Sequence, residues 1–387
     1  MSISPSILEM TRRLVAFDTT SRNSNLELID YVRAYLADLG VDSELVHNAE
    51  RTKANLYATL GPGDRPGIAL SGHTDVVPVD GQAWDSDPFE TVNKDDRLYG
   101  RGTCDMKGFI AVCLALASEF LARPIATPLH LVCSYDEEVG CIGVRTLTDQ
   151  LATRELRPRM CIIGEPTEMQ VIRAHKGMRT FRCRVRGHES HSSLTPLGVN
   201  AVEAAAEAIA YLKGMARRLR DHGPYDGELT PPYTTVHTGT ISGGTALNIV
   251  PRRCEFEFEF RHLPEDDPDA LFDELRAYVE RELIPEMHAV DPASGFEFDT
   301  RSRMPGLATA EDAEVVQLAK ALSGANRTAK VSFGTEGGHF ANAGIPTVIC
   351  GPGSIAQAHK PNEFITLEQL ARCETFVRRL FEHCWEG

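Results

Sequence analysis

The first part of the chain alternates between helical and strand patterns. Apolar residues recur every three or four positions over residues 7–17 and 26–39, which predicts two amphipathic helices, the second ending at Gly40. Three short apolar runs of strand length follow, at residues 67–71, 129–134 and 160–163. Helical stretches such as residues 108–121 separate them. This alternation predicts an α/β domain whose sheet is covered on both faces.

The middle of the chain has a different pattern. Residues 180–186 alternate polar and apolar side chains, and residues 255–260 (EFEFEF) do so without interruption, which predicts strands with one solvated face. The other expected elements are an Ala-rich helix, a Thr-rich strand, a second helix and a short strand, at residues 200–219, 234–241, 269–283 and 296–298. The resulting order, βαββαβ, is typical of a small two-layer α+β sandwich.

Helical spacing returns after about residue 303. It is followed by an apolar strand at residues 346–350 and a last helix over residues 367–384. We therefore expect one α/β domain in two parts, residues 1–177 and 303–387, interrupted by an α+β domain over residues 178–302.

Length, charge and cysteine usage exclude several classes of protein. A chain of 387 residues is longer than one ordinary domain of about 100–200 residues. Its 40 Lys and Arg against 55 Asp and Glu give a net charge of −15, which disfavours nucleic acid as a partner. No apolar run approaches the roughly 20 residues of a membrane span, and no secretory signal pattern is visible, so we expect a cytoplasmic protein. Ten cysteines without a CxxC pair are interpreted as reduced, mostly buried thiols.

Candidate metal ligands follow the predicted strands. They are His73 and Asp75 after the first apolar run, Glu137 and Glu138 after the second, Glu165 after the third, Asp105 in the glycine-rich loop at residues 100–108, and His359 after the last strand. Because ligands of open α/β sheets bind outside the carboxyl ends of the strands, we expect these side chains to converge.

Two imidazoles with several carboxylates and no thiolate suit zinc or cobalt in an open catalytic site. The chemistry expected of such a site is hydrolysis. Taken singly, each residue has a simpler interpretation: Asp105 could cap the following helix, and Asp75 could orient His73 rather than bind a metal. Phosphate binding by the glycine-rich loop is disfavoured, because the loop lacks a GxxxxGK[ST] pattern.

Four segments carry a resemblance to a known family. They are SGHTDVVP at 71–78, YGRGTCDMKG at 99–108, SYDEEVG at 134–140 and GEPT at 164–167. Together they resemble the dinuclear zinc amidohydrolases, which include acetylornithine deacetylase, succinyl-diaminopimelate desuccinylase, aminoacylase and glutamate carboxypeptidase. The resemblance covers essentially the whole chain. It implies a mixed-sheet, zinc-peptidase-like catalytic domain with an inserted α+β lid that also forms a dimer.

The resemblance also implies a role for each candidate ligand. His73 and Glu165 would bind one zinc ion, Glu138 and His359 the other, and Asp105 would bridge them, with cobalt able to substitute. Glu137 would serve as general base and then general acid. A cis peptide bond is expected after Asp105.

In the lid, residues 187–193 (GHESHSS) match a family segment whose histidine reaches the active site of the partner in a homodimer. His191 would then stabilise the oxyanion. Asn248 and Arg261 match positions that bind the substrate carboxylate, a task that suits a bidentate Arg. On residue type alone, a histidine such as His191 is usually exposed polar surface, and Arg261 could equally be part of a surface ion pair.

Two late segments distinguish branches of the family. Residues 333–340 (FGTEGGHF) and 350–363 (CGPGSIAQAHKPNE) are similar to acetylornithine deacetylases, and the GGTSD segment more typical of the desuccinylases is absent. This implies hydrolysis of N2-acetyl-L-ornithine to L-ornithine and acetate in arginine biosynthesis. Glu336 could then meet the ornithine ammonium group, whereas His339 has no assigned role.

Two other functions remain open. The same chemistry could act on another small molecule, such as a succinylated diamine, a different N-acyl amino acid or a small peptide. A catalytically silent binding relative is disfavoured, because every matching position is filled.

Overall fold

Two units make up the computed structural model, which describes residues 3–386. Unit 1 comprises the chain up to residue 175, residues 307–330 and the chain from residue 335 onward. Unit 2 comprises residues 176–306 and 331–334.

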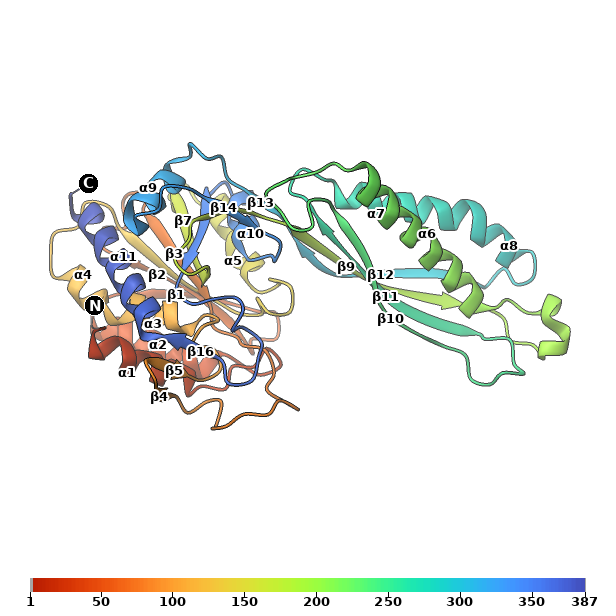
Figure 1. Cartoon of the computed structure of the whole chain (residues 1–387), viewed down its shortest axis with the longest axis horizontal. Coiled ribbons are helices and arrows are strands. Elements are labelled where there is room, and N and C mark those ends of the chain that lie inside the picture. The colour runs from red at the N-terminus through yellow and green to blue at the C-terminus, as the bar shows by residue number, and fades with distance from the viewer. Residues whose placement is uncertain (1–2, 387) are drawn as a thin grey trace. The chain divides into compact units, whose positions relative to one another are not determined.

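Unit 1 is built around a nine-stranded mixed sheet (Figure 1). The strand order is β1 (Ser43–His47), β2 (Ala54–Leu60), β6 (Leu129–Ser134), β3 (Ile68–His73), β7 (Met160–Pro166), β15 (Thr347–Gly351), β8 (Ile172–His175) and β13 (Leu307–Ala308), with β14 (Ala329–Val331) also pairing with β8. The neighbours β6, β3, β7 and β15 are parallel. Every residue of β3, β6 and β7 is buried, as expected for parallel strands covered on both faces.

The helices of unit 1 pack against this sheet and against one another. They are α1 (Pro5–Val15), α2 (Leu26–Asp38), α3 (Lys107–Ala115), α4 (Ala117–Leu121), α5 (Val144–Thr153), α9 (Glu314–Ser323), α10 (Gly337–Asn342) and α11 (Leu367–Glu386). Alternate residues of β3, Ile68 and Leu70, share one hydrophobic core with α3, α9 and α11. The single helix predicted over residues 108–121 is interrupted at Leu116, which ends α3 and begins α4.

A small three-stranded sheet lies beside the glycine-rich loop in sequence. Its order is β16 (Phe364–Thr366), β5 (Arg97–Tyr99) and β4 (Val92–Lys94). The antiparallel register pairs Phe364 with Tyr99. This pairing brings the segment that follows His359 next to the start of the loop that carries Asp105.

Unit 2 has two layers. Its four-stranded antiparallel sheet has the order β10 (Thr235–Gly243), β11 (Arg253–His262), β9 (Gly177–Arg186) and β12 (Gly295–Met304). Its helical elements are η1 (Ser192–Leu197), α6 (Ala201–His222), α7 (Pro268–Tyr278), η2 (Val279–Leu283) and α8 (Ile284–His288). The strands and main helices follow the order βαββαβ along the chain.

The alternating sequence of β11 explains the two faces of this sheet. Phe256, Phe258 and Phe260 are buried in the core of unit 2, which also contains residues of α6 and α7. On the opposite face, Arg182 Nη2 lies 2.9 Å from Glu257 Oε1 on the neighbouring strand. The predicted mixed α/β class is confirmed for the chain as a whole.

All ten cysteines are buried free thiols. Among the described residues, no helix has the length and apolar character that a membrane span requires.

Candidate metal centre and active site

Most of the predicted ligands gather at the carboxyl ends of neighbouring parallel strands in unit 1. His73 is the last residue of β3, Glu165 lies next to last in β7, and Glu137 and Glu138 follow the end of β6. Close packing beneath them depends on Gly164: a Cβ atom there would lie 2.0 Å from Cγ of Phe109 in α3. The apolar strands thus deliver three groups of polar side chains to one edge of the sheet.

Asp105 stands between two imidazoles. Its Oδ1 lies 3.0 Å from His73 Nε2, and its Oδ2 lies 3.4 Å from His359 Nε2. His359 Nε2 is also 2.9 Å from Glu138 Oε2, and His73 Nε2 is 3.6 Å from Glu165 Oε1. Each carboxylate oxygen of Asp105 therefore faces a separate His–Glu pair. The peptide bond between Asp105 and Met106 is cis.

This cluster fits metal binding. Ligand atoms within 4.8 Å of one another come from two overlapping groups: His73, Glu137 and Glu165, and His73, Asp105 and Glu138. Glu165 Oε1 is buried and has no hydrogen-bond partner within residues 3–386. Because carboxylates crowded in a buried site repel one another, a cation among them would offset both the repulsion and the missing contact.

The acid–base properties of the cluster reflect this crowding. Burial, reinforced by Asp105, raises the pKa of Glu138 to about 7 and that of Glu165 well above its ordinary value. Hydrogen bonds to Asp105 and Glu138 raise the pKa of His359 to about 10. Burial opposes a charged His73, but Glu165 and Asp105 prevail and raise its pKa. In the absence of metal, these side chains therefore bind protons at the positions that metal ions would occupy.

Glu137 differs from its neighbour Glu138. No ion pair joins it to either imidazole among the described residues, and its Oε1 accepts a hydrogen bond of 3.2 Å from Cys141 Sγ. Burial, together with Glu138 and Asp105 and despite the opposing effect of His73, raises the pKa of Glu137 to about 8. A carboxylate with such a pKa is suited to accept and return a proton near neutral pH.

Asp75 contacts His73 through its main-chain oxygen. His73 Nδ1 lies 2.8 Å from the main-chain oxygen of Asp75 and 3.6 Å from its carboxylate, so the main-chain oxygen is the nearer acceptor. The carboxylate instead accepts hydrogen bonds from the main-chain N–H groups of Glu137 and Glu138, at 3.1 and 3.2 Å. Ser21 Oγ donates a further bond of 2.7 Å to it. Asp75 therefore holds both His73 and the loop after β6.

Glu336 lies inside unit 1 at the start of α10 and is only 1% exposed. Ser71 of β3 donates a hydrogen bond to Oε1, and Ser134 of β6 donates one of 2.7 Å to Oε2. Both oxygens are therefore occupied by strand residues. His339, in α10, is buried, and burial lowers its pKa to about 4.

Of the predicted residues of unit 2, His191 and Asn248 lie in loops beyond the start of β11, and Arg261 lies within β11 near its end. His191 and Asn248 are neighbours at the start of β11: Ser192 N–H donates to the Asn248 main-chain oxygen, and Ile249 bridges His191. Arg261 lies near the other end of β11, where its Nε is 3.1 Å from Glu259 Oε1. At about 3.3 Å per residue, the strand between Arg253 and Arg261 spans about 26 Å.

The hydrogen bonds of His191 define its tautomer. The main-chain N–H of Ser193 donates to His191 Nδ1 at 3.1 Å, so this nitrogen is an acceptor. In the neutral imidazole the other nitrogen, Nε2, then carries the proton. His191 is exposed and can therefore offer an N–H donor to a partner.

Two buried residues next to the cluster were missed by sequence reasoning. Arg101 and Glu363 form an ion pair of 2.7 Å with side chains 1% and 0% exposed. Both lie in the motif segments at residues 99–108 and 350–363, but charged residues in a loop are ordinarily solvated. Only the pairing of β5 with β16 reveals that they meet.

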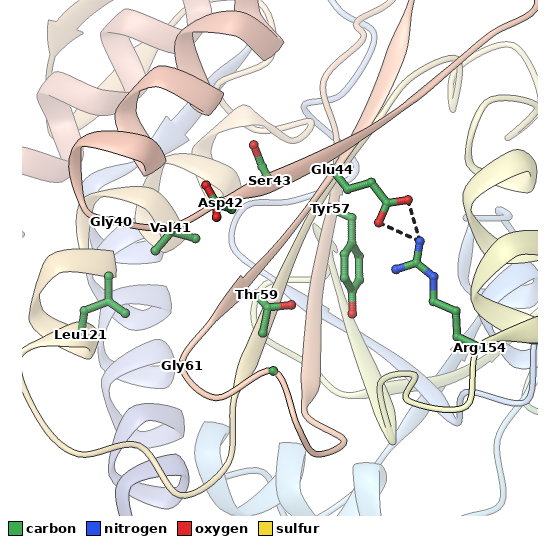
Figure 2. A pocket seen from close by; sticks show the side chains of 11 residues that line it. Gly40, Val41, Asp42, Ser43, Glu44, Tyr57, Thr59, Gly61, Leu121 and Arg154 are labelled. Carbon is green, nitrogen blue, oxygen red and sulfur yellow. Dashed lines mark hydrogen bonds and ion pairs between the residues drawn. The ribbon is translucent and has the colours of Figure 1, made fainter.

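A separate pocket of about 710 Å³ lies at the β1 edge of the sheet (Figure 2). Figure 2 shows Glu44 and Arg154 paired on one side of it, with Arg154 Nη2 2.6 Å from Glu44 Oε1. None of the candidate ligands lines this pocket.

The chain is similar to proteins of known type over nearly all of its length. The model of the peptidase family M20/M25/M40 matches residues 69–383. An acetylornithine deacetylase of Myxococcus xanthus is 36% identical over 388 residues, covering 99% of this chain and 98% of that protein. One from Pasteurella multocida (strain Pm70) is 36% identical over 371 residues, covering 94% of each.

Solved structures share the fold. A tripeptidase from Staphylococcus aureus has a TM-score of 0.77 at 21% identity and covers 100% of both chains. An M20 family metallo-carboxypeptidase from Sulfolobus solfataricus has a TM-score of 0.76 at 19% identity, covering 98% of this chain and 99% of its own. The family expected from the four sequence segments is thus confirmed. The chain belongs to the peptidase family M20/M25/M40 and is a metal-dependent hydrolase.

Proposed function

We propose that this protein hydrolyses the amide bond of N2-acetyl-L-ornithine, releasing L-ornithine and acetate. The observation that carries the proposal is the position of Asp105, with one carboxylate oxygen facing His73 and the other facing His359. The substrate is supported by the relatives named acetylornithine deacetylase, which are 36% identical over nearly the whole chain. As part of this proposal, the reaction belongs to arginine biosynthesis and takes place in the cytoplasm.

Two zinc ions are the cofactors we propose. His73 and Glu165 would hold one ion, Glu138 and His359 the other, and Asp105 would bridge them, with cobalt able to substitute. A related Bacillus subtilis protein of the same fold is described as a dinuclear metal-binding peptidase. When bound, such ions polarise a carbonyl group and lower the pKa of water. The absence of thiolates in the cluster favours an open catalytic site over a closed structural one.

Glu137 is the proposed proton carrier. Its carboxylate would take a proton from the attacking water and return it to the nitrogen of the leaving amine. Its place beside Glu138, outside the ion pairs that the two imidazoles make, supports this assignment. Asp75 would be a positioning residue, because its carboxylate binds the main-chain N–H groups of Glu137 and Glu138.

We propose that unit 2 serves as lid and dimerisation domain of a homodimer. His191 would stabilise the developing oxyanion through its Nε2–H, and Asn248 and Arg261 would bind the substrate carboxylate. Since His191 and Arg261 lie at opposite ends of β11, one copy of unit 2 does not bring them together, and a second copy would supply the missing group.

The outer edge of unit 2 supports such an assembly. Strand β10 is an edge strand, and most of its residues are exposed. Ile241 and Leu247, which are 53% and 102% exposed, add apolar surface next to it. Exposed edges and apolar groups of this kind are ordinarily covered in an assembly.

Glu336 remains a predicted contact of the ornithine ammonium group. Its two hydrogen bonds to Ser71 and Ser134 offer it an internal role instead.

The test of the proposed function is release of acetate and free amine by the zinc- or cobalt-loaded protein. N2-acetyl-L-ornithine is compared with N-succinyl-diaminopimelate, acetylmethionine and a glutamyl dipeptide, and the Glu137→Ala variant serves as control. We expect the highest kcat/KM for N2-acetyl-L-ornithine and a loss of about 10²–10⁴-fold in the variant. A higher kcat/KM for another substrate would leave the metal-dependent hydrolysis standing but reject N2-acetyl-L-ornithine as the substrate. If none of the four compounds is hydrolysed, the result would favour a catalytically silent binding relative.

A further inference from the structure

One oxygen of Glu363 gathers the main chain of the loop that carries Asp105. Glu363 Oε1 accepts three N–H hydrogen bonds, from Gly102 at 3.0 Å, from Cys104 at 2.9 Å and from Asp105 at 3.1 Å. The main-chain oxygen of Glu363 accepts a fourth, from Gly100 at 2.9 Å. The position of the Asp105 main chain therefore depends directly on this carboxylate.

The other oxygen of Glu363 connects to the loop that carries His359. Glu363 Oε2 accepts a bond of 2.7 Å from Arg101 Nη1, and Arg101 Nη2 donates one of 2.6 Å to Gln82 Oε1. Gln82 Nε2 in turn donates to the main-chain oxygen of His359 at 3.0 Å. One continuous chain of hydrogen bonds thus joins Asp105 to His359 through side chains that are not candidate ligands.

Both loops consist of turns rather than helix or strand, and one direct bond also joins them, from Cys104 Sγ to the main-chain oxygen of Ser354 at 3.4 Å. Asp105 precedes α3, and His359 lies between β15 and β16 with a positive φ of 64°. His359 is also 55% exposed at its side chain, so packing constrains it weakly. A buried ion pair costs desolvation energy, which is offset here by the number of hydrogen bonds that each partner makes.

We propose that Glu363 and Arg101 are positioning residues that set the spacing of Asp105 and His359 and thereby the affinity of the metal centre. This inference rests on the metal site proposed above. It predicts that the pair affects metal binding even though neither residue would touch an ion. Partners that orient metal ligands typically change metal affinity 10–100-fold when they are replaced.

The test is a titration of metal-free protein with cobalt(II), followed by calorimetry and by the visible absorption of the bound ion. Glu363→Gln retains the shape and one acceptor oxygen but turns an NH₂ group toward Arg101 or toward the three amides. The control is Glu374→Gln, since Glu374 is likewise buried and ion-paired, with Arg378 at 2.5 Å, but belongs to α11. We expect cobalt to bind Glu363→Gln 10–100-fold more weakly than wild type, and Glu374→Gln to bind it like wild type.

Wild-type cobalt affinity in a folded Glu363→Gln variant would overturn the inference, as would an equal loss of affinity in Glu374→Gln. If Glu363→Gln does not fold, Gln82→Ala decides the question, because Gln82 is only partly buried. We expect this variant to show a smaller loss of cobalt affinity, and unchanged affinity would count against the proposal. Failure of the wild-type protein to bind cobalt would instead reject the metal site itself.

Discussion

At the residue scale, buried carboxylates hold the ends of the strands and loops that carry the site. Glu336 joins β3 to β6 through Ser71 and Ser134, and Glu363 joins the loops of Asp105 and His359. Asp75 does the same for the loop after β6. Acidic side chains thus hold the main chain and the strands around the cluster in place through hydrogen bonds.

Glu336→Gln separates an internal role from a contact with substrate. Because both carboxylate oxygens already accept hydroxyl hydrogen bonds inside unit 1, we expect kcat to fall about tenfold with little change in KM for N2-acetyl-L-ornithine. Steady-state kinetics with acetylmethionine, which lacks the side-chain ammonium group, is the matched control. A rise in KM for acetylornithine alone would show instead that Glu336 binds the ammonium group.

At the element scale, strand β6 carries a buried histidine that makes stability depend on pH. His130 Nδ1 lies 3.0 Å from Thr59 Oγ1, whereas its buried Nε2 has no partner among the described residues. Burial, with a contribution from Arg154, lowers the pKa of His130 to about 4. Since the ordinary value is 6.5, the unfolded chain binds more protons between pH 6.5 and 4, and stability is lost as pH falls through this window.

We expect His130→Phe to reduce this pH dependence. Without the titration of His130, the unfolding free energy should change less steeply with pH, by up to about 1.4 kcal/mol per pH unit between pH 6.5 and 4. Denaturant unfolding at several pH values measures the slope, and replacement of the exposed His222 in α6 is the control. An unchanged slope in His130→Phe would mean that His130 is not held neutral by the fold.

Sequence patterns could predict the elements better than their connections. The apolar runs of β3, β6 and β7 and the alternation of β11 follow from local periodicity, and polar residues after these strands lie together in the structure. The pair of Arg101 and Glu363 could not be predicted in this way. The two residues are 262 positions apart in sequence, and their contact depends on the register of β5 against β16.

Local sequence patterns also could not predict some details within the predicted motifs and helices. The sequence HTD, at 73–75, suggested that Asp75 orients His73, but it could not show that the main-chain oxygen of Asp75 is the nearer acceptor. The break at Leu116 likewise interrupts an apolar stretch whose composition favours one continuous helix.

At the scale of the whole molecule, the proposed homodimer makes a prediction about mixed dimers. His191→Ala and Glu137→Ala would each be nearly inactive alone. If each site takes His191 from the second copy, a mixed dimer regains one complete site, so an equilibrated equal mixture should show about a quarter of wild-type activity. Acetate release by the mixture measures this, and native mass spectrometry establishes that mixed dimers have formed. Mixed dimers without recovered activity would contradict a shared site.

The most direct test of the metal-dependent mechanism is acetate release from N2-acetyl-L-ornithine as zinc is returned to chelator-treated protein. Because the cluster divides around Asp105 into two His–Glu pairs, we expect no activity without metal and saturation by two zinc ions per chain. Circular dichroism of the metal-free protein verifies that it stays folded. Full activity in folded protein from which all metal has been removed would contradict the account.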